Sequence, residues 1–225
     1  MGTSSQKFNC PYCNKELPSP SRKRNCPHCK NMVYARSRPG VEKVWVKEEN
    51  LKTIEKEWKN YRAAAEFKRG LKSSNLGFTE KKYLKTKEGL TRKFGFIPSE
   101  SNTLWGVSNF LSEEAIRMKD WHKMKMLYFN MALFLHQESK DCFKILQEVA
   151  RCELKNEQKS GVVERVEILT AGDQSCSACQ ELAGKILTIE EALRDMPIPV
   201  KICSFKLNPE APSGWCRCCY VPVIE

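Results

Sequence analysis

The chain has 225 residues, of which 41% are hydrophobic and 29% are charged, a composition that excludes a wholly disordered chain and suits one large domain or two to three small ones. Its formal net charge is +11, and residues 1–100 hold 23 Lys and Arg against 10 Asp and Glu, so the basic character belongs to the N-terminal half. A localised basic half is typical of a protein with a polyanionic partner, most often nucleic acid, and equally of a lysine-rich solvated helix surface.

The sequence has no apolar run with the length of a signal-peptide core or a transmembrane helix. We therefore expect a cytoplasmic protein with no membrane partner. Of the twelve cysteines, eight fall in two modules with metal-ligand spacing and two more cluster at the end. This spacing disfavours a secreted disulfide scaffold, and reduced CxxC pairs bind zinc.

Residues 1–38 contain two CxxC pairs, Cys10 with Cys13 and Cys26 with Cys29. Two thiolates three residues apart in a tight turn can hold one side of a tetrahedral ion, so two such pairs predict a structural zinc site. Each pair resembles a rubredoxin-type zinc knuckle, and together they resemble a zinc ribbon. Because all four ligand positions are filled, we expect this module to stabilise a fold and to perform no chemistry.

The segment between the two CxxC pairs is strongly basic. Arg22, Lys23 and Arg24 stand at its tip, where a phosphate contact is natural. A solvated loop is the alternative, and a zinc ribbon can also serve as a protein docking module. His28 lies inside the second CxxC loop and is interpreted as a flanking residue.

Residues 39–78 are predicted to form a basic helix that ends at Gly70, followed by a Ser/Asn/Gly linker. One apolar face recurs at alternating spacings of three and four: Leu51, Ile54, Trp58, Tyr61 and Ala65. This face is expected to pack within the molecule, and a homodimer seam is the alternative.

Residues 79–160 are predicted to form a helical domain. Residues that favour helix starts occur at Thr79, at Ser99 or Ser101, at Ser112 and at Asp141. An apolar stripe that begins at Trp121 and a following helix predict a helical hairpin joined near residues 137–140. Two histidines and two cysteines of this hairpin have no catalytic partner in the sequence. His122 and His136 are expected at the surface or in hydrogen bonds, and Cys142 and Cys152 as buried free thiols.

Residues 161–225 are predicted to form a cysteine-rich α+β zinc module. Strands are expected within residues 162–170 and 184–187, and Thr188 with Glu191 predicts a capping box for a short helix. Cys176 and Cys179 supply one knuckle, and Cys203 plus Cys216 or Cys218 would complete a tetrahedron, with Cys216 favoured. A remaining thiol, with Cys219 among the candidates, is a redox alternative.

The last module also carries a longer pattern. It consists of Asp173, Cys176, Cys179, Leu182, Gly184, Lys185, Pro197, Pro199, Cys203, Cys216, Arg217 and Cys218. This pattern resembles the C-terminal cysteine motif of phage-Mu-type minor head (head morphogenesis) proteins. The resemblance implies a metal-stabilised fold and a role in particle assembly. Two departures are the distance from Cys203 to Cys216 and the short helical portion before the motif.

The fold class expected overall is mainly α with two small zinc-stabilised modules that hold two zinc ions. No phosphate-binding glycine loop, GxSxG, HExxH or Cys/His pair with a supporting acid occurs. We therefore expect a non-enzymatic zinc-binding adaptor for nucleic acid or another protein. A phage or prophage assembly factor is one alternative. A zinc-knuckle nuclease is another, with acids available at Asp173, Glu181, Glu190 and Glu191.

Overall fold

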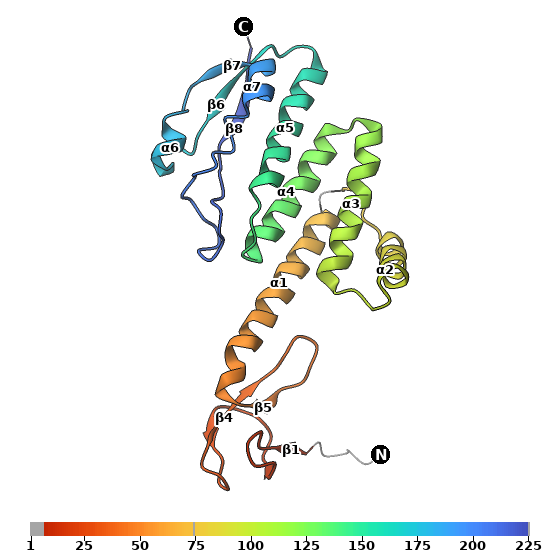
Figure 1. The fold of residues 1–225 in the computed structure, drawn as a ribbon, viewed down its shortest axis with the longest axis vertical. Coiled ribbons are helices and arrows are strands. Elements are labelled where there is room, and N and C mark those ends of the chain that lie inside the picture. The colour runs from red at the N-terminus through yellow and green to blue at the C-terminus, as the bar shows by residue number, and fades with distance from the viewer. Residues whose placement is uncertain (1–6, 74, 225) are drawn as a thin grey trace. The chain divides into compact units, whose positions relative to one another are not determined.

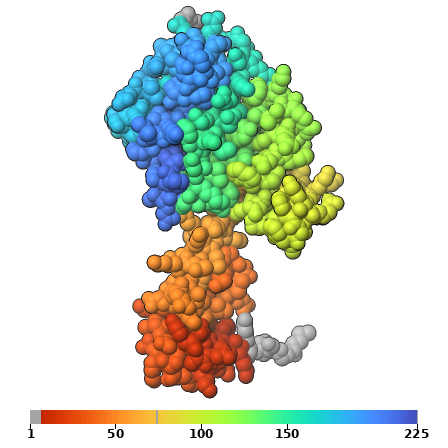
Figure 2. Space-filling model, in the orientation of Figure 1, coloured from red at the N-terminus to blue at the C-terminus, as the bar shows by residue number. Residues whose placement is uncertain are grey.

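The computed structural model describes residues 7–73 and 75–224 (Figure 1). The chain divides into two compact units, Met1–Arg62 and Ala63–Glu225, which we call unit 1 and unit 2. Figure 2 shows residues 7–62 of unit 1 in red and orange. None of the helices in the described ranges combines the length and apolar character needed to cross a membrane.

Unit 1 begins with two short β-hairpins, each of which carries one CxxC pair in its turn. Strands β1 (Phe8–Asn9) and β2 (Glu16–Leu17) form the first hairpin. Strands β3 (Arg24–Asn25) and β4 (Met32–Arg36) form the second, and β5 (Val44–Val46) extends it to an antiparallel sheet of order β3-β4-β5. The core is small and includes two of the cysteines: Cys10, Leu17, Cys26, Val33, Ala35 and Trp45.

Helix α1 (Leu51–Ser73) follows a 3-10 turn, η1 (Glu48–Asn50). The predicted end at Gly70 is wrong, because the helix continues to Ser73. A Cβ at position 70 would lie 3.1 Å from the side-chain amide carbon of Asn130 and closer still to its oxygen. Glycine at this position leaves room for the Asn130 side chain of α4, and it does not stop the helix.

The apolar face predicted for this helix is correct only in part. Ile54 is buried, whereas Tyr61 is 48% exposed and Ala65 is exposed. In the second half of the helix the buried positions are Ala63, Ala64, Phe67 and Leu71.

Four further helices make up most of unit 2: α2 (Glu80–Phe94), α3 (Glu100–Met118), α4 (Trp121–Gln137) and α5 (Phe143–Ser160). Two predicted N-caps are confirmed, because Thr79 accepts a hydrogen bond from the Lys82 N–H and Ser99 accepts one from the Asn102 N–H. The predicted start at Ser112 is wrong. Ser112 is buried within α3, and the next helix starts after Asp120, which accepts from the Lys123 N–H.

The core of the helical part lies between α1, α3 and α4. Phe67 stacks on Phe134 with ring centroids 4.7 Å apart, and Leu104, Leu111 and Leu127 are fully buried beside them. The predicted Met and aromatic stripe of α4 belongs to this core, with Met124 and Met131 as its buried members. Helices α4 and α5 form the predicted hairpin.

The C-terminal part of unit 2 is a three-stranded antiparallel sheet covered by helices. Its strands are β6 (Arg165–Leu169), β7 (Ile186–Thr188) and β8 (Cys219–Val223), in the order β7-β6-β8. A 3-10 turn, η2 (Gly172–Gln174), precedes the short helix α6 (Ser177–Gln180), and α7 (Ile189–Asp195) lies against α5 (Figure 1). The capping box between Thr188 and Glu191 is confirmed.

The fold class is as predicted: mainly helical, with small sheets and a cysteine cluster near each end of the chain.

Candidate metal centres

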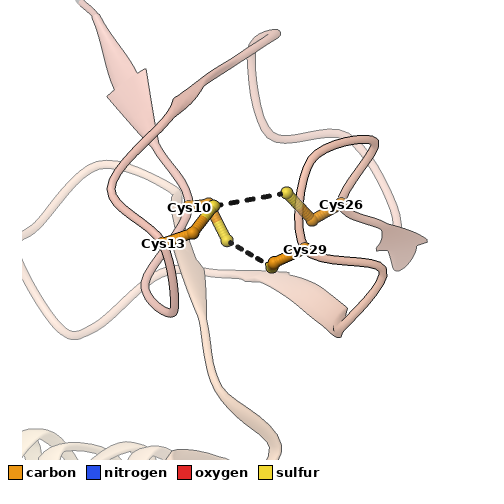
Figure 3. A group of neighbouring side chains, drawn as sticks. All are labelled: Cys10, Cys13, Cys26 and Cys29. Atoms are coloured by element: carbon orange, nitrogen blue, oxygen red, sulfur yellow. Dashed lines mark hydrogen bonds between the residues drawn. The ribbon is translucent and has the colours of Figure 1, made fainter.

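The first centre lies in unit 1, where the turns of the two hairpins face each other. Figure 3 shows the side chains of Cys10, Cys13, Cys26 and Cys29 converging from two loops. Their four sulfur atoms all lie within 4.8 Å of one another, and the closest pairs are Cys10 with Cys29 at 3.8 Å and Cys13 with Cys26 at 3.7 Å. A tetrahedron with metal–sulfur bonds of about 2.3 Å has edges of about 3.8 Å. The four sulfurs therefore have the spacing that one tetrahedral metal ion requires.

The backbone of each turn is built in the same way. In the first turn the Cys10 N–H donates to the Lys15 carbonyl at 2.8 Å, and the Asn14 N–H donates to the Cys10 carbonyl at 2.9 Å. The second turn repeats both bonds at 2.9 Å, between Cys26 and Asn31 and between Lys30 and Cys26. Asn14 and Lys30 adopt left-handed backbone conformations, with φ of 59° and 62°. The two knuckles are thus equivalent, as the sequence predicted from the repeated CxxC pattern.

The neighbouring groups shift the pKa values of Cys13 and Cys26 in opposite directions. Burial acts to raise the pKa of the Cys26 thiol, but the backbone N–H groups of Cys29 and His28 and the neighbouring thiols lower this pKa to about 6. The backbone N–H of Lys15 acts to lower the pKa of Cys13, and burial with the neighbouring sulfurs outweighs it and raises the pKa to about 11. Each new thiolate repels the next, so full ionisation needs a cation among the sulfurs. The chemistry of this donor set therefore fits a bound metal ion.

The basic tip predicted between the two knuckles is exposed. Arg22 and Lys23 lie in the loop between β2 and β3, and Arg24 begins β3. Within residues 7–73 and 75–224, none of these three side chains forms an ion pair. His28 is exposed and lies outside the sulfur cluster.

The second centre lies in unit 2, where three segments meet. Cys176 is the N-cap of α6 and Cys179 lies within that helix, Cys203 follows α7, and Cys216 and Cys218 precede β8. Two sets of three sulfurs lie within 4.8 Å of one another: Cys176 with Cys179 and Cys203, and Cys179 with Cys216 and Cys218. The Cys179 and Cys216 sulfurs are 3.9 Å apart. The structure thus brings together the four predicted ligands and one further thiol, that of Cys218.

The position of Cys218 distinguishes it from Cys216. A hollow of about 10 Å³, which is about the space that one water molecule needs, has a lining that includes four of the cysteines. The lining residues are Cys176, Cys179, Cys203, Cys218, Gln174, Ser175, Ala171, Phe205 and Arg217. Cys216 is absent from this lining, although its sulfur lies close to that of Cys179. The sequence could not decide whether Cys216 or Cys218 is the fourth ligand, because the two residues stand only two positions apart and both spacings suit a zinc site.

The loops around the second centre are held by specific contacts. The Arg217 guanidinium lies 3.9 Å from the centroid of the Phe205 ring and donates to the Gln174 carbonyl at 3.0 Å. The Trp215 N–H donates to the Phe205 carbonyl at 2.6 Å. Gly214 packs directly on the Cys203 backbone. These contacts fix the segment that carries Cys216 and Cys218 against the segment that carries Cys203.

His136 supports the same loops from α4 and is fully buried. Its Nε2 accepts hydrogen bonds from the N–H groups of Leu207 and Asn208, at 3.2 and 3.1 Å. Its Nδ1 lies 3.7 Å from the Cys142 sulfur. For His136 the sequence predicted either a surface position or hydrogen bonds, and the structure shows hydrogen bonds. Through them His136 anchors the segment that follows Cys203. Burial and then the positive charge of Lys206 lower the pKa of His136 below its usual value.

A pH dependence of stability follows from His136. A lowered folded-state pKa means that the neutral ring stabilises the fold fully above the unfolded-state value of 6.5, and that this contribution is lost as the pH falls below it. We expect the thermal midpoint of the metal-loaded protein to drop between pH 7.5 and pH 5.5, and His136→Gln to reduce that drop. Exposed His122 provides the control, because His122→Gln should leave the drop unchanged. An equal drop in the wild type and in His136→Gln would contradict this assignment.

The other cysteines lie outside both centres. Cys142 and Cys152 are buried free thiols, as predicted, and burial raises the pKa of each. Cys219 starts β8 and belongs to neither set of metal-binding sulfurs. Within the described parts of the chain, the groups that can hold a metal ion consist of cysteines alone, and the acids at Asp173, Glu181, Glu190 and Glu191 belong to none of them.

Comparison of the chain with protein families, with curated proteins and with solved structures finds no match. The resemblance to phage head proteins therefore rests on the cysteine pattern of residues 173–218 alone. What is established is that the protein has two cysteine clusters, each with a donor set that can hold a metal ion.

Proposed function

We propose that the protein is a non-enzymatic zinc-binding adaptor that binds nucleic acid through unit 1. Thiolate ligands in a tetrahedral arrangement favour Zn²⁺ over harder cations such as Mg²⁺ and Ca²⁺. In the first centre all four ligand positions are supplied by the protein, so no position is left for a water molecule or a substrate. Zinc at this centre would stabilise the two knuckles and hold the basic tip between them.

The observation that carries the nucleic-acid proposal is the charge of unit 1. Residues 1–62 contain 14 Lys and Arg against 6 Asp and Glu, a net charge of +8. Arg22, Lys23 and Arg24 are exposed and have no ion-pair partner among the described residues, so their charge is available to a polyanion. Lysine and arginine side chains at such a tip bind phosphates and release counterions from the nucleic acid.

A groove in the same unit adds a surface for a base. The groove has a volume of about 430 Å³ and is lined by Arg36, Leu51, Ile54, Glu55, Trp58 and Arg62. The Trp58 indole N–H donates to the Ser37 carbonyl at 2.8 Å, which fixes the ring. An aromatic ring in the same groove as two arginines is typical of surfaces that stack a base and bind the neighbouring phosphates. Glu55 leaves the lining with a net charge of +1, which still favours an anion.

The basic tip is tested by Arg22→Ala, Lys23→Ala and Arg24→Ala in one variant of the full chain. We expect nucleic-acid affinity at low salt to fall roughly 10- to 100-fold, and the slope of log affinity against log salt to fall by about 2 to 3. Fluorescence anisotropy with labelled single-stranded and duplex oligonucleotides, repeated over a salt series, measures both quantities.

The control for the tip variant removes the same charge elsewhere, through Lys144→Ala, Lys185→Ala and Lys201→Ala in unit 2. All three of these lysines are exposed. If the basic tip contacts the nucleic acid, the control variant should keep most of the wild-type affinity for the oligonucleotides. Equal losses in both variants would show that only net charge matters, and no binding by the wild type would favour a protein partner instead.

The groove is tested by Trp58→Leu, which keeps an apolar side chain but removes the stacking ring. Stacking of one base contributes about 1–3 kcal/mol, so affinity for single-stranded oligonucleotides should fall about 5- to 150-fold. Duplex affinity should change little, because paired bases are not available for stacking. Tyr12→Leu is the matched control, since Tyr12 is an exposed aromatic residue of the same unit. A similar loss for Tyr12→Leu, or for duplex, would contradict a stacking role.

A second candidate function is assembly of a phage or prophage particle. It is favoured by one observation, the convergence in space of the residues that resemble the head-protein motif, Cys176, Cys179, Cys203 and Cys218. Co-sedimentation with capsid or portal protein, together with no retention on nucleic acid, would support this candidate over the first.

A further inference from the structure

The second centre holds more sulfur than one tetrahedral ion needs. Five thiols gather there, and the two sets of close sulfurs share Cys179. The first centre, by contrast, has four thiols for four positions. We propose that one ion in the second centre has three constant ligands, Cys176, Cys179 and Cys203, and a fourth ligand that exchanges between Cys218 and Cys216. This inference rests on the zinc-binding part of the proposed function and is independent of its nucleic-acid part.

The two exchanging thiols lie within reach of the same ion. Cys218 lines the hollow of about 10 Å³ together with the three constant ligands, whereas the Cys216 sulfur lies 3.9 Å from that of Cys179. Cys216, Cys218 and Cys179 also lie within 4.8 Å of one another. Rotation of a cysteine between staggered χ1 positions moves its sulfur by roughly 3 Å. A side-chain rotation is therefore enough to exchange one sulfur for the other.

The segment that carries the two thiols is held in place by contacts of Trp215 and Arg217. Arg217 is held by the Phe205 ring and the Gln174 carbonyl. Trp215 is held by its N–H bond to the Phe205 carbonyl. Because the segment is anchored beside both cysteines, the exchange needs no rearrangement of the chain.

Small molecules can reach the exchanging pair, Cys216 and Cys218, through a cavity. A cavity of about 300 Å³ is lined by both Cys216 and Cys218, and by Arg217, Cys219, Glu153 and Lys125 among others. The constant ligands Cys176, Cys179 and Cys203 do not line it. A small thiol or chelator in this cavity would meet the labile ligand first.

The exchange step is balanced without any further reactant. The Cys216 thiol would release its proton to water as its sulfur takes the ligand position that Cys218 leaves. The bond from the ion to the Cys218 sulfur breaks, and that thiolate takes up a proton from water. The charge of the centre and the oxidation state of every atom are unchanged. An external chelator that enters the cavity beside Cys216 and Cys218 could take the place of the exchanging sulfur and remove the ion, whereas the first centre has no spare thiol for such an exchange.

The test uses full-length protein loaded with Zn²⁺, and compares Cys216→Ser, Cys218→Ser, the double variant and Cys176→Ser by elemental analysis. We expect two ions in the wild type and in each of the first two variants, and one ion in the double variant and in Cys176→Ser. The ion of the first centre should persist throughout, which shows that each variant remains folded in unit 1.

Release of zinc to an excess of a chromogenic chelator tests the exchange itself. The wild type should show a fast phase for one ion, and this phase should slow about tenfold in both Cys216→Ser and Cys218→Ser. Loss of the ion in only one of these variants would show a fixed fourth ligand and overturn the proposal, as would an unchanged release rate in both.

Two other possible results concern the number of zinc ions in the wild type. Three ions in the wild type would show two metal positions in the second centre and overturn a single exchanging ion. One ion in the wild type would remove metal from the second centre altogether, and with it this proposal, but would leave nucleic-acid binding by unit 1 to be judged on its own measurements.

Discussion

Replacement of Cys26 by serine is expected to unfold the β-sheet part of unit 1 and to remove one metal ion from the protein. Cys26 is fully buried, and with Cys10 it accounts for two of the six residues of the local core. The remaining core, Leu17, Val33, Ala35 and Trp45, is too small to stabilise the hairpins alone. Binding of structural zinc to such modules contributes about 10–16 kcal/mol at neutral pH, comparable with the whole stability of a typical domain.

Hydrogen exchange followed by mass spectrometry measures this effect segment by segment. Protection of the amides in β3, β4 and β5 should disappear in Cys26→Ser, while the amides of α3, α4 and α5 keep theirs. Cys152→Ser is the control: it alters a buried cysteine of α5 that belongs to neither centre, so both ions should remain. Retention of two ions by Cys26→Ser, with a protected β-sheet, would contradict the zinc-dependent fold.

Gly214→Ala is expected to abolish metal binding at the second centre. A Cβ at this position would overlap the Cys203 carbonyl oxygen and would lie 2.7 Å from the carbonyl carbon. Both atoms belong to the backbone and cannot rotate away, so Cys203 and the segment carrying Cys216 must separate. A shift of about 1 Å is enough to spoil tetrahedral ligation. Elemental analysis should find one ion in place of two, and the thermal midpoint of unit 2 should fall.

A second glycine provides the matched control for this substitution. Gly89 lies within α2 and a Cβ there would meet no atom within 4 Å. Gly89→Ala should therefore keep both ions and raise stability by up to about 1 kcal/mol, because alanine favours a helix over glycine. Two ions in Gly214→Ala would mean that the backbone around Cys203 can yield, and would contradict the close packing described above.

Features that depend on residues close in the sequence were predicted well. The N-caps at Thr79 and Ser99 and the capping box of Thr188 and Glu191 each join groups three positions apart, so a local pattern contains the whole interaction. The same reasoning applies to the first metal centre, whose two knuckles are local turns of identical build.

Features decided by packing were predicted poorly. Ser112 has the local pattern of a helix start, yet it lies buried inside α3 because Leu111 and Ala115 continue the core-facing stripe. Gly70 has the local signal of a helix end, yet it marks the approach of Asn130 from α4. Strand β5 was not anticipated, because three residues become a strand only through pairing with β4 and burial of Trp45.

The second metal centre combines a local feature that was predicted with distant features that were not. The pair Cys176 and Cys179 is local and was identified from its spacing, whereas the remaining ligands come from distant segments. Sequence spacing brought Cys203, Cys216 and Cys218 into consideration but could not rank the last two, because their roles depend on how residues 214–217 pack on Phe205. The support given by His136 could not be predicted, because its partners Leu207 and Asn208 lie about seventy positions away in the chain.

The left-handed residues of the two knuckles have a consequence for the evolution of this chain. Asn14 and Lys30 each follow directly after the second cysteine of a pair, and both have positive φ. Asparagine and glycine adopt this conformation at little cost, whereas valine, isoleucine and threonine are strongly disfavoured there. Mutational drift at these two positions is therefore expected to be confined to glycine, asparagine and unbranched side chains. A sequence search for distant homologues would separate true from chance matches better if it combined the cysteine spacing with this restriction on the residue that follows each CxxC pair.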